Sequence, residues 1–331
     1  MPADIDLELP EDRNDTVRLT DWVEAYMLVN ATEQLSEEDI RELLRIQTEG
    51  IDDLAGAGFG EPGELGELDV PSLGEDAART QAELILGEIA RRERRALRGC
   101  ANRTVYPFAR TPAGIELNRG ENSILYEFLL WLSLTNAPFR RETYGSKVTR
   151  FFDLLGQAVL VAYLGPGAQA RRFGWPPVKD RPKRLDDALD WLAAEMRRSR
   201  GEVAPVNPDG KDAGVDVVAW RPFSDDLHGY VIVLAQCTVS QGAFVQKLAD
   251  IKERLWSAFL GLGQPPVTAM LVPFDVSSAD EWKWSEFHYA VGIVIDRPRI
   301  VELLCLIKPE DIHDFKRIAA WTRQKRRALA V

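Results

Sequence analysis

The spacing of apolar residues divides the chain into a helical first part and a second part that contains strands. Apolar positions recur at helical intervals in residues 36–47, 76–99, 144–165 and 184–199, and these four segments are predicted helices. Early acids, late arginines and a terminal glycine support the helix at 76–99, because they complement its dipole and its end. Residues 123–134 are almost continuously apolar, so periodicity leaves helix and strand open there.

Short valine-rich runs mark the strands of the second part. Residues 215–220, 230–237, 267–274 and 290–295 are continuous apolar runs bounded by turn residues, which is typical of strands buried on both faces. A segment with helical spacing at 244–259 separates the second run from the third. The order strand, strand, helix, strand predicts a hairpin followed by a parallel crossover. We therefore expect an α/β fold with a mixed sheet flanked by helices.

Acidic residues are concentrated in the first hundred positions. These positions carry 25 Asp and Glu against 10 Arg and no Lys, whereas the rest of the chain has 31 basic and 27 acidic residues. We predict an acidic, mainly helical N-terminal region at 1–103 and an α/β domain at 104–331 with a basic C-terminal helix. The acidic region is a candidate docking surface for a protein partner, and a homo-oligomer remains open.

The sequence also bears on the compartment. The apolar runs are shorter than the roughly 18 residues that a membrane helix needs, and the acidic N-terminus lacks the pattern of a signal peptide. Cys100, Cys237 and Cys305 lie far apart, without metal-type spacing or an even disulfide framework. We expect a reduced, cytoplasmic protein that does not enter a membrane.

Two basic segments of the second part are candidates for phosphate contact. Residues 171–184 hold six basic residues and one acid, and residues 316–331 hold six basic residues and no acid. An aromatic residue among the cations of the first segment suits the stacking of unpaired nucleotides. The predicted nucleic-acid-binding residues are Arg171, Arg172, Trp175, Lys179, Arg181, Lys183 and Arg184. The alternative is a solvated loop and a solvated tail.

An acid at the head of one apolar run and an amide at the end of the next are the strongest sign of a site. Asp216 follows Val215 in the first strand, and burial of a carboxylate requires a cation or another partner. Gln236 ends the next strand, and antiparallel pairing places both residues at one rim of the sheet. Two oxygen ligands there, with a further acid from a helix, suit Mg²⁺ or Mn²⁺.

Other common site patterns are missing from the sequence. No Gly-rich phosphate loop ends in Lys-Ser or Lys-Thr, and no cysteine or histidine spacing is of the zinc type. The three histidines, His228, His288 and His313, are scattered, and nothing marks a serine nucleophile.

The segments GVDVVAW and VIVLAQC, preceded by a helix acid, resemble the PD-(D/E)xK nuclease superfamily, particularly its Mrr-like members in restriction and phage defence. The resemblance covers about residues 144–274. It implies a restriction-endonuclease-like core and metal-dependent hydrolysis of nucleic-acid phosphodiesters, with DNA as the expected substrate. The family's helix acid falls on Asp153, its strand aspartate on Asp216 and its glutamine on Gln236. The resemblance implies that these three residues hold the metal.

One position departs from the family pattern. The family lysine, two residues after the glutamine, is Thr238 here, and threonine supplies no cation. Lys211, in the turn before Asp216, or Lys247, on the following helix, would have to replace it. Three readings therefore remain: an active nuclease, a catalytically inactive nuclease-fold protein that binds nucleic acid or acts as an adaptor subunit, and a protein-interaction module that uses the acidic region.

Overall fold

The computed structural model describes residues 15–45, 75–99, 105–120, 122–134, 146–177, 180–225, 227–240, 247, 250–276, 289 and 292–329. The helices are α1 (Thr16–Val29), α3 (Glu75–Gly99), α4 (Ser123–Ser133), α6 (Ser146–Leu164), α7 (Leu185–Glu195), α9 (Glu253–Leu260), α11 (Arg297–Leu304) and α12 (Phe315–Leu329), with a 3₁₀ turn η1 (Pro309–Asp311). The strands are β1 (Gln34–Ser36), β2 (Phe108–Thr111), β3 (Gly114–Leu117), β4 (Gln169–Arg172), β5 (Val217–Trp220), β6 (Ile232–Cys237), β7 (Val267–Leu271) and β8 (Ile293–Ile295). Residues 37–45 are also helical.

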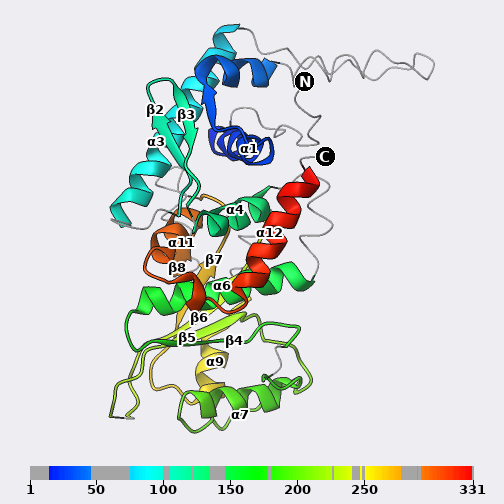
Figure 1. Ribbon diagram of the computed structural model, residues 1–331. Coiled ribbons are helices and arrows are strands. Elements are labelled where there is room, and N and C mark those ends of the chain that lie inside the picture. The colour runs from blue at the N-terminus through cyan, green and yellow to red at the C-terminus, as the bar shows by residue number, and fades with distance from the viewer. Residues whose placement is uncertain are drawn as a thin grey trace, which may run out of the picture.

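A five-stranded mixed sheet forms the lower half of the molecule in Figure 1. Its strand order is β4-β5-β6-β7-β8, antiparallel from β4 to β6 and parallel from β6 to β8. Helix α6 covers one face, whereas α7 and α9 lie on the other (Figure 1). Alternate residues of the central strands therefore enter two different cores: Val217 joins the α6 side and Val218 the α7 and α9 side. This arrangement confirms the predicted mixed sheet with helices on its faces.

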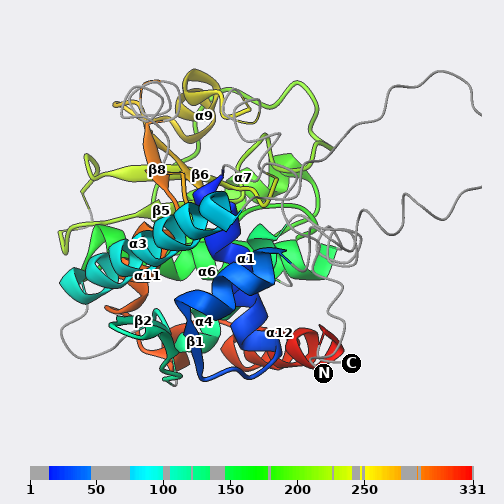
Figure 2. The ribbon, with the colours of Figure 1, turned by 90° about the horizontal axis from the view of Figure 1, so that it is seen from above.

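A layer of helices and a small antiparallel sheet lies on the far side of α6 from the large sheet (Figure 1). The small sheet has the order β1-β3-β2, and Leu35 of β1 pairs with Ile115 of β3. Viewed from above, α3 crosses over α6 (Figure 2). The predicted boundary at 103/104 falls between α3 and β2, and the described residues on both sides of it share this sheet and one buried cluster.

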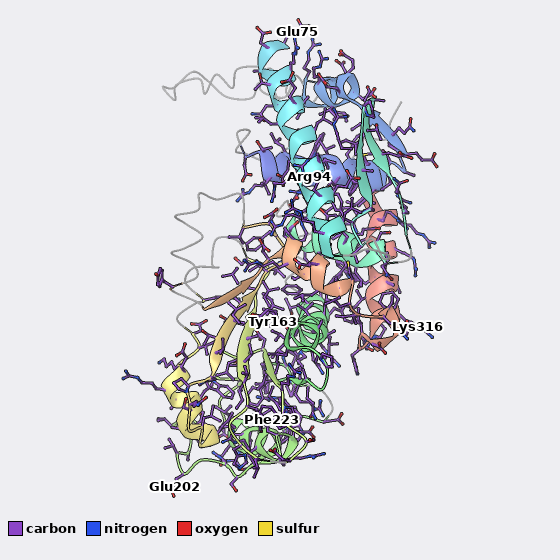
Figure 3. All side chains as sticks on the ribbon, turned by 90° about the vertical axis from the view of Figure 1, so that its left-hand side faces the viewer. Glu75, Arg94, Tyr163, Glu202, Phe223 and Lys316 are labelled. Carbon is purple, nitrogen blue, oxygen red and sulfur yellow. The ribbon has the colours of Figure 1, made fainter. Side chains whose placement is uncertain are left out.

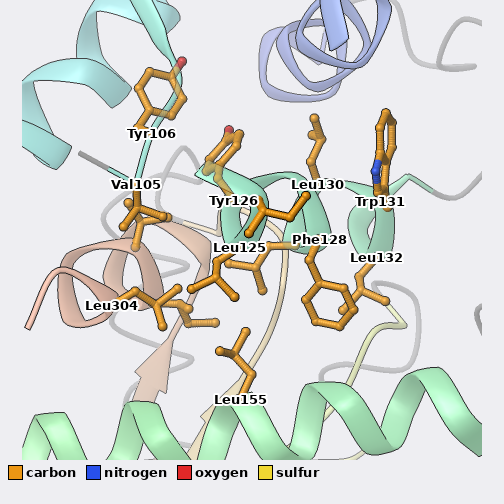
Figure 4. Close-up of a cluster of buried hydrophobic side chains, with 14 of the residues drawn as sticks. Val105, Tyr106, Leu125, Tyr126, Phe128, Leu130, Trp131, Leu132, Leu155 and Leu304 are labelled. Atoms are coloured by element: carbon orange, nitrogen blue, oxygen red, sulfur yellow. The ribbon is translucent and has the colours of Figure 1, made fainter. Parts of the chain in front are cut away.

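Helix α4 lies at the centre of that cluster. Residues 123–133 are all buried, which explains why the periodicity of this segment was uninformative: a helix packed on every side is apolar on every side. Figure 4 shows Leu125 and Phe128 pointing from α4 toward α6, which carries Leu155, with Leu304 of α11 on the side of Leu125. The cluster thus joins the upper layer to the helix that covers the large sheet.

Three local expectations need correction. The predicted helix at 244–259 is not continuous, because residues 250–252 are not helical and α9 begins at Glu253. The predicted basic loop begins as a strand, β4. Its two arginines are consecutive, and Arg172 is buried whereas Arg171 is only partly buried. Cys305 is disulfide-bonded, so the expectation of reduced cysteines is wrong for it.

Within the described part of the chain, no helix combines the length and the apolar character needed to cross a bilayer.

Candidate functional site

The end of β4, the start of β5 and the end of β6 lie side by side in the large sheet. Antiparallel pairing sets Arg172, at the end of β4, and Ala235, near the end of β6, beside Val217 at the start of β5. Asp216 continues this pairing just before β5: its N–H donates to Ala235 at 2.9 Å, and its carbonyl accepts from Phe173 at 2.7 Å. The backbone of Asp216 is thereby fixed from both sides.

The side chain of Asp216 accepts a hydrogen bond but lies in surroundings that oppose its charge. Its Oδ2 accepts from the Cys237 N–H at 2.8 Å. Burial and the nearby Asp212 carboxylate together raise the pKa of Asp216 to about 6, although the Cys237 N–H and the charge of Lys247 lower it. A carboxylate in this state gains from an added cation.

Asp153 reaches the same place from α6. It is 5% exposed, and both Nε and an Nη of Arg172 contact its Oδ2, at 2.9 and 2.8 Å. Burial and the proximity of Asp216 still raise the pKa of Asp153 well above its usual value, although Arg172 lowers it. The guanidinium of Arg172 therefore contacts one of the two buried carboxylates, Asp153, and the pair is short of positive charge.

Gly174 shows how closely the two acids approach. A Cβ added at Gly174 would lie 2.6 Å from Asp216 Oδ1 and 3.4 Å from Asp153 Oδ2. Because real Cβ contacts are longer than the first of these distances, only glycine fits beside the carboxylates without displacing them.

Gln236 adds an amide whose oxygen lacks a protein partner. Its Nε2 donates to Asp250 Oδ2 at 3.3 Å, whereas its Oε1 is buried and has no hydrogen-bond partner among the described residues. The whole residue is 7% exposed. An amide oxygen held without a donor in a buried place is costly, and it is satisfied by a ligand that brings a donor or a cation.

These groups line one cavity of about 690 Å³. Its lining residues are Thr149, Asp153, Trp175, Asp212, Ala213, Gly214, Asp216, Gln236, Cys237, Lys247, Asp250, Lys252 and Leu255. The three residues that the sequence predicted as metal ligands, Asp153, Asp216 and Gln236, are all among them. Sequence reasoning missed Asp250 and Lys252, because both lie in the segment that was predicted as continuous helix.

The two candidate replacement lysines lie in different places. Lys247 lines the cavity, and its charge lowers the pKa of Asp216. Lys211 is exposed and does not line the cavity, and its carbonyl accepts from Arg181. Thr238 is 1% exposed, and its hydroxyl accepts from the Ser240 N–H at 3.3 Å. Of the two lysines that the sequence offered as replacements, Lys247 is the one placed to act in the cavity.

Most of the predicted nucleic-acid-binding arginines are engaged within the protein. Arg172 and Arg181 are each 2% exposed, so neither side chain fits the alternative of a solvated loop. Arg172 neutralises Asp153, and Arg181 lies over the Phe173 ring, with its guanidinium carbon 4.3 Å from the ring centre.

The remaining residues of this predicted set lie nearer the surface. Arg171 pairs with Glu195 at 2.6 Å and Arg184 with Asp209 at 3.0 Å. Lys183 is exposed, and Lys179 lies outside the described residues. Trp175 is 40% exposed and lines the cavity. Of the described residues in this segment, Trp175 lines the cavity and the basic residues do not.

The donor set partly fits a hard divalent cation. Carboxylate and amide oxygens are the ligands that Mg²⁺ and Mn²⁺ take, and the unpartnered Gln236 Oε1 is an orphaned oxygen of this kind. Over the residues described, no group of three or more His, Cys, Asp and Glu side chains is arranged to hold a metal ion. A cation at this place would rely on Asp216 and Gln236, with Asp153 contributing the carboxylate that Arg172 also contacts.

Comparison with models of protein families, with curated proteins and with solved structures finds no match to this chain. The site's own chemistry is therefore the basis for a functional assignment.

Proposed function

We propose that the chain is a metal-dependent nuclease that hydrolyses DNA phosphodiesters at the cavity lined by Asp153, Asp216 and Gln236. The observation that carries this proposal is the meeting of a helix acid, a strand acid and a strand amide in one cavity, with Gln236 Oε1 buried and without a partner among the described residues. These are the positions that the resemblance to PD-(D/E)xK nucleases assigned from the sequence alone.

The order of elements supports a restriction-endonuclease-like core. Helix α6 is followed by the antiparallel strands β4, β5 and β6, with helix α7 between β4 and β5. Helix α9 comes next, and then β7, which runs parallel to β6. In this arrangement the helix acid and the residues at the β5 and β6 ends face one another, as a shared metal site requires.

Each residue has a distinct task in the proposed reaction. A bound Mg²⁺ or Mn²⁺ supplies Lewis-acid neutralisation of the phosphate and a more acidic water. Asp216, Gln236 and Asp153 would hold the cation, and Arg172 keeps Asp153 in place. Lys247 supplies positive charge beside the phosphate, which is the contribution that Thr238 cannot make. The oxygen of a water molecule bonds to phosphorus, the phosphodiester P–O bond breaks, and a proton that the water gives up ends on the leaving oxygen.

A second candidate is a nuclease fold that binds nucleic acid without cleaving it. Two observations favour it: Thr238 replaces the motif lysine, and Arg172 contacts Asp153 Oδ2, where a cation would compete with it. In this case Arg172 stands in for the metal, and the chain acts as an adaptor or binding subunit.

Cleavage of plasmid, linear duplex and single-stranded DNA with Mg²⁺ or Mn²⁺ tests the proposal. Wild-type protein is expected to cleave, Asp216→Asn to lose at least about two orders of magnitude in rate because the metal loses a charged ligand, and Glu202→Gln to cleave normally. Glu202 is exposed and lies at the lower end of the molecule (Figure 3). Equal rates for Asp216→Asn and wild type would refute the assignment of the site, and DNA binding without cleavage would favour the second candidate.

A further inference from the structure

Three backbone hydrogen bonds hold residues 173–175 against the site. The N–H groups of Phe173 and Gly174 both donate to the Asp216 carbonyl, at 2.7 and 2.9 Å, and the N–H of Trp175 donates to Asp212 Oδ2 at 3.0 Å. Asp212 Oδ1 also accepts from the Gly214 N–H at 3.1 Å. The backbone that carries Trp175 is therefore fixed relative to the carboxylates.

The Trp175 side chain, in contrast, is left open. It is 40% exposed and lines the cavity, whereas Trp220 and Trp256 of the same half of the molecule are at most 1% exposed. A large exposed aromatic ring on a fixed backbone can bind a flat ligand, and the backbone does not first have to become ordered. A nucleobase is such a ligand, because every base has a face that stacks on an aromatic ring.

The strand order places positive charge on the other flank of the site. Strands β4 and β6 lie on either side of β5, so the segment after β4, with Trp175, and the segment after β6, with Lys247 and Lys252, flank Asp216. Both lysines line the cavity, and Lys247 lies close enough to lower the pKa of Asp216. The site thus has an aromatic ring on one side of the acids and two lysines on the other. The ring suits a nucleobase, and the lysines suit the phosphate next to it.

The burial of the site residues favours single-stranded over double-stranded nucleic acid. Asp153 is 5% exposed and Gln236 7% exposed, and the cavity of about 690 Å³ is the size of a small-ligand pocket. In a duplex, the bases are stacked inside and cannot lie against Trp175, and neighbouring phosphates are held along a stiff rod. An unpaired nucleotide can stack its base on the Trp175 ring and place its phosphate beside Asp216, where Lys247 and Lys252 line the cavity.

We propose that this cavity takes an unpaired nucleotide of single-stranded DNA, with its base stacked on Trp175 and its phosphate held by Lys247 and Lys252 beside Asp216. The proposal rests on the proposed function in that it uses the same cavity, and it adds the substrate class: single strands, or nucleotides displaced from a duplex, rather than intact duplex.

Fluorescence anisotropy of labelled oligonucleotides with the full chain tests this proposal. A single strand and a blunt duplex of the same sequence are titrated in Ca²⁺, a hard cation that takes oxygen ligands. Wild type is expected to bind the single strand more tightly than the duplex. Trp175→Ala is expected to weaken single-strand binding about ten-fold or more, and Trp175→Phe much less, because a ring remains.

Phe223→Ala is the matched control, since Phe223 is 64% exposed in the turn between β5 and β6 and does not line the cavity (Figure 3). It is expected to bind both DNAs as wild type does. Wild type that prefers duplex, binds neither DNA, or is indifferent to Trp175→Ala would overturn the single-strand proposal. Cleavage is measured separately: single-strand binding without cleavage removes the nuclease assignment alone, and duplex cleavage that ignores Trp175 removes this inference alone.

Discussion

Among the residues that the structure describes, two clusters of buried charge are built on opposite principles. The paired cluster, between α1, α3 and α11, consists of Asp21, Glu24, Glu88, Arg92 and Arg297. The cavity cluster consists of Asp153, Arg172, Asp216 and Gln236. Both bury carboxylates, yet the first has two arginines placed among its acids and the second has one arginine bound to a single acid.

The paired cluster satisfies its members from within. Arg92 contacts Asp21, Glu24 and Glu88 at 2.8 to 2.9 Å, and Arg297 contacts Asp21. The hydroxyls of two tyrosines, Tyr106 and Tyr126, both donate to Glu24. In the cavity cluster, Gln236 Oε1 lacks a partner among the described residues, and both carboxylates line a cavity. Buried charge that is fully paired serves the fold, whereas buried charge that is short of partners and open to a cavity indicates a ligand.

Arg92→Met breaks the paired cluster and should have the largest effect. It leaves Asp21 and Glu24 facing Arg297 alone, and loss of one partner from a buried ion pair costs about 3–5 kcal/mol. Urea unfolding followed by circular dichroism measures this loss, and a variant that fails to fold agrees with it. A loss below about 1 kcal/mol would show that water reaches this cluster and that its acids do not depend on internal pairing.

Arg172→Gln tests whether the cavity cluster depends equally on its one arginine. We expect a smaller loss of stability, about 2 kcal/mol at pH 8, because Asp153 can take up a proton when its counter-ion is removed. The loss should shrink toward pH 5, where the unpaired acid is neutral. Unfolding free energies at the two pH values check this, with Arg172→Lys as the variant that keeps the charge. A loss that is the same at both pH values would contradict the assignment of Arg172 as the counter-ion of Asp153.

Asp216→Asn should sharpen the contrast by stabilising the protein. The pKa of Asp216 is about 6 in the folded protein, against an ordinary value of 3.8, so its ionisation opposes folding above pH 6 and has no such effect below pH 4. The difference between these two pKa values sets a ceiling of about 3 kcal/mol, and we expect a gain of about 1–2 kcal/mol at pH 8.

Melting temperatures of wild type and Asp216→Asn, measured from pH 4 to pH 8, check this sign. The difference between them should be absent near pH 4 and grow as the pH rises through about 6. Addition of Mg²⁺ should raise the melting temperature of wild type more than that of the variant. A variant that is less stable than wild type at pH 8 would mean that the site is built for the ionised acid without a cation.

Sequence patterns predicted the strands well because valine-rich runs are short, distinct and bounded by turns. Asp216 and Gln236 stood out since polar residues inside such runs need a reason. The burial of Arg172 was not predicted, because four arginines and two lysines lie close together in this part of the sequence. Its inward direction depends on strand β4, whose sequence QARR has no apolar alternation to reveal it.

The partners of the site residues were also beyond the reach of sequence patterns. Asp153 and Arg172 are 19 residues apart, on a helix and an edge strand whose pairing is a tertiary property. Asp250 was hidden in a segment with unbroken helical spacing, and only the packed structure shows the interruption at 250–252. The helix at 123–134 was ambiguous for the opposite reason, since full burial removes the polar face that distinguishes helix from strand.

The contact between Asp21 and Arg297 joins residues 276 positions apart. During synthesis, Asp21 is made 276 positions before Arg297. Helix α1 therefore cannot settle into its final surroundings until Arg297 has left the ribosome, and helix α12, which packs against α1 and α4, is made later still. A nascent chain that is released early would expose the apolar faces of α1 and α4, so chaperones and proteases should be able to recognise incomplete copies of this protein by their N-terminal layer.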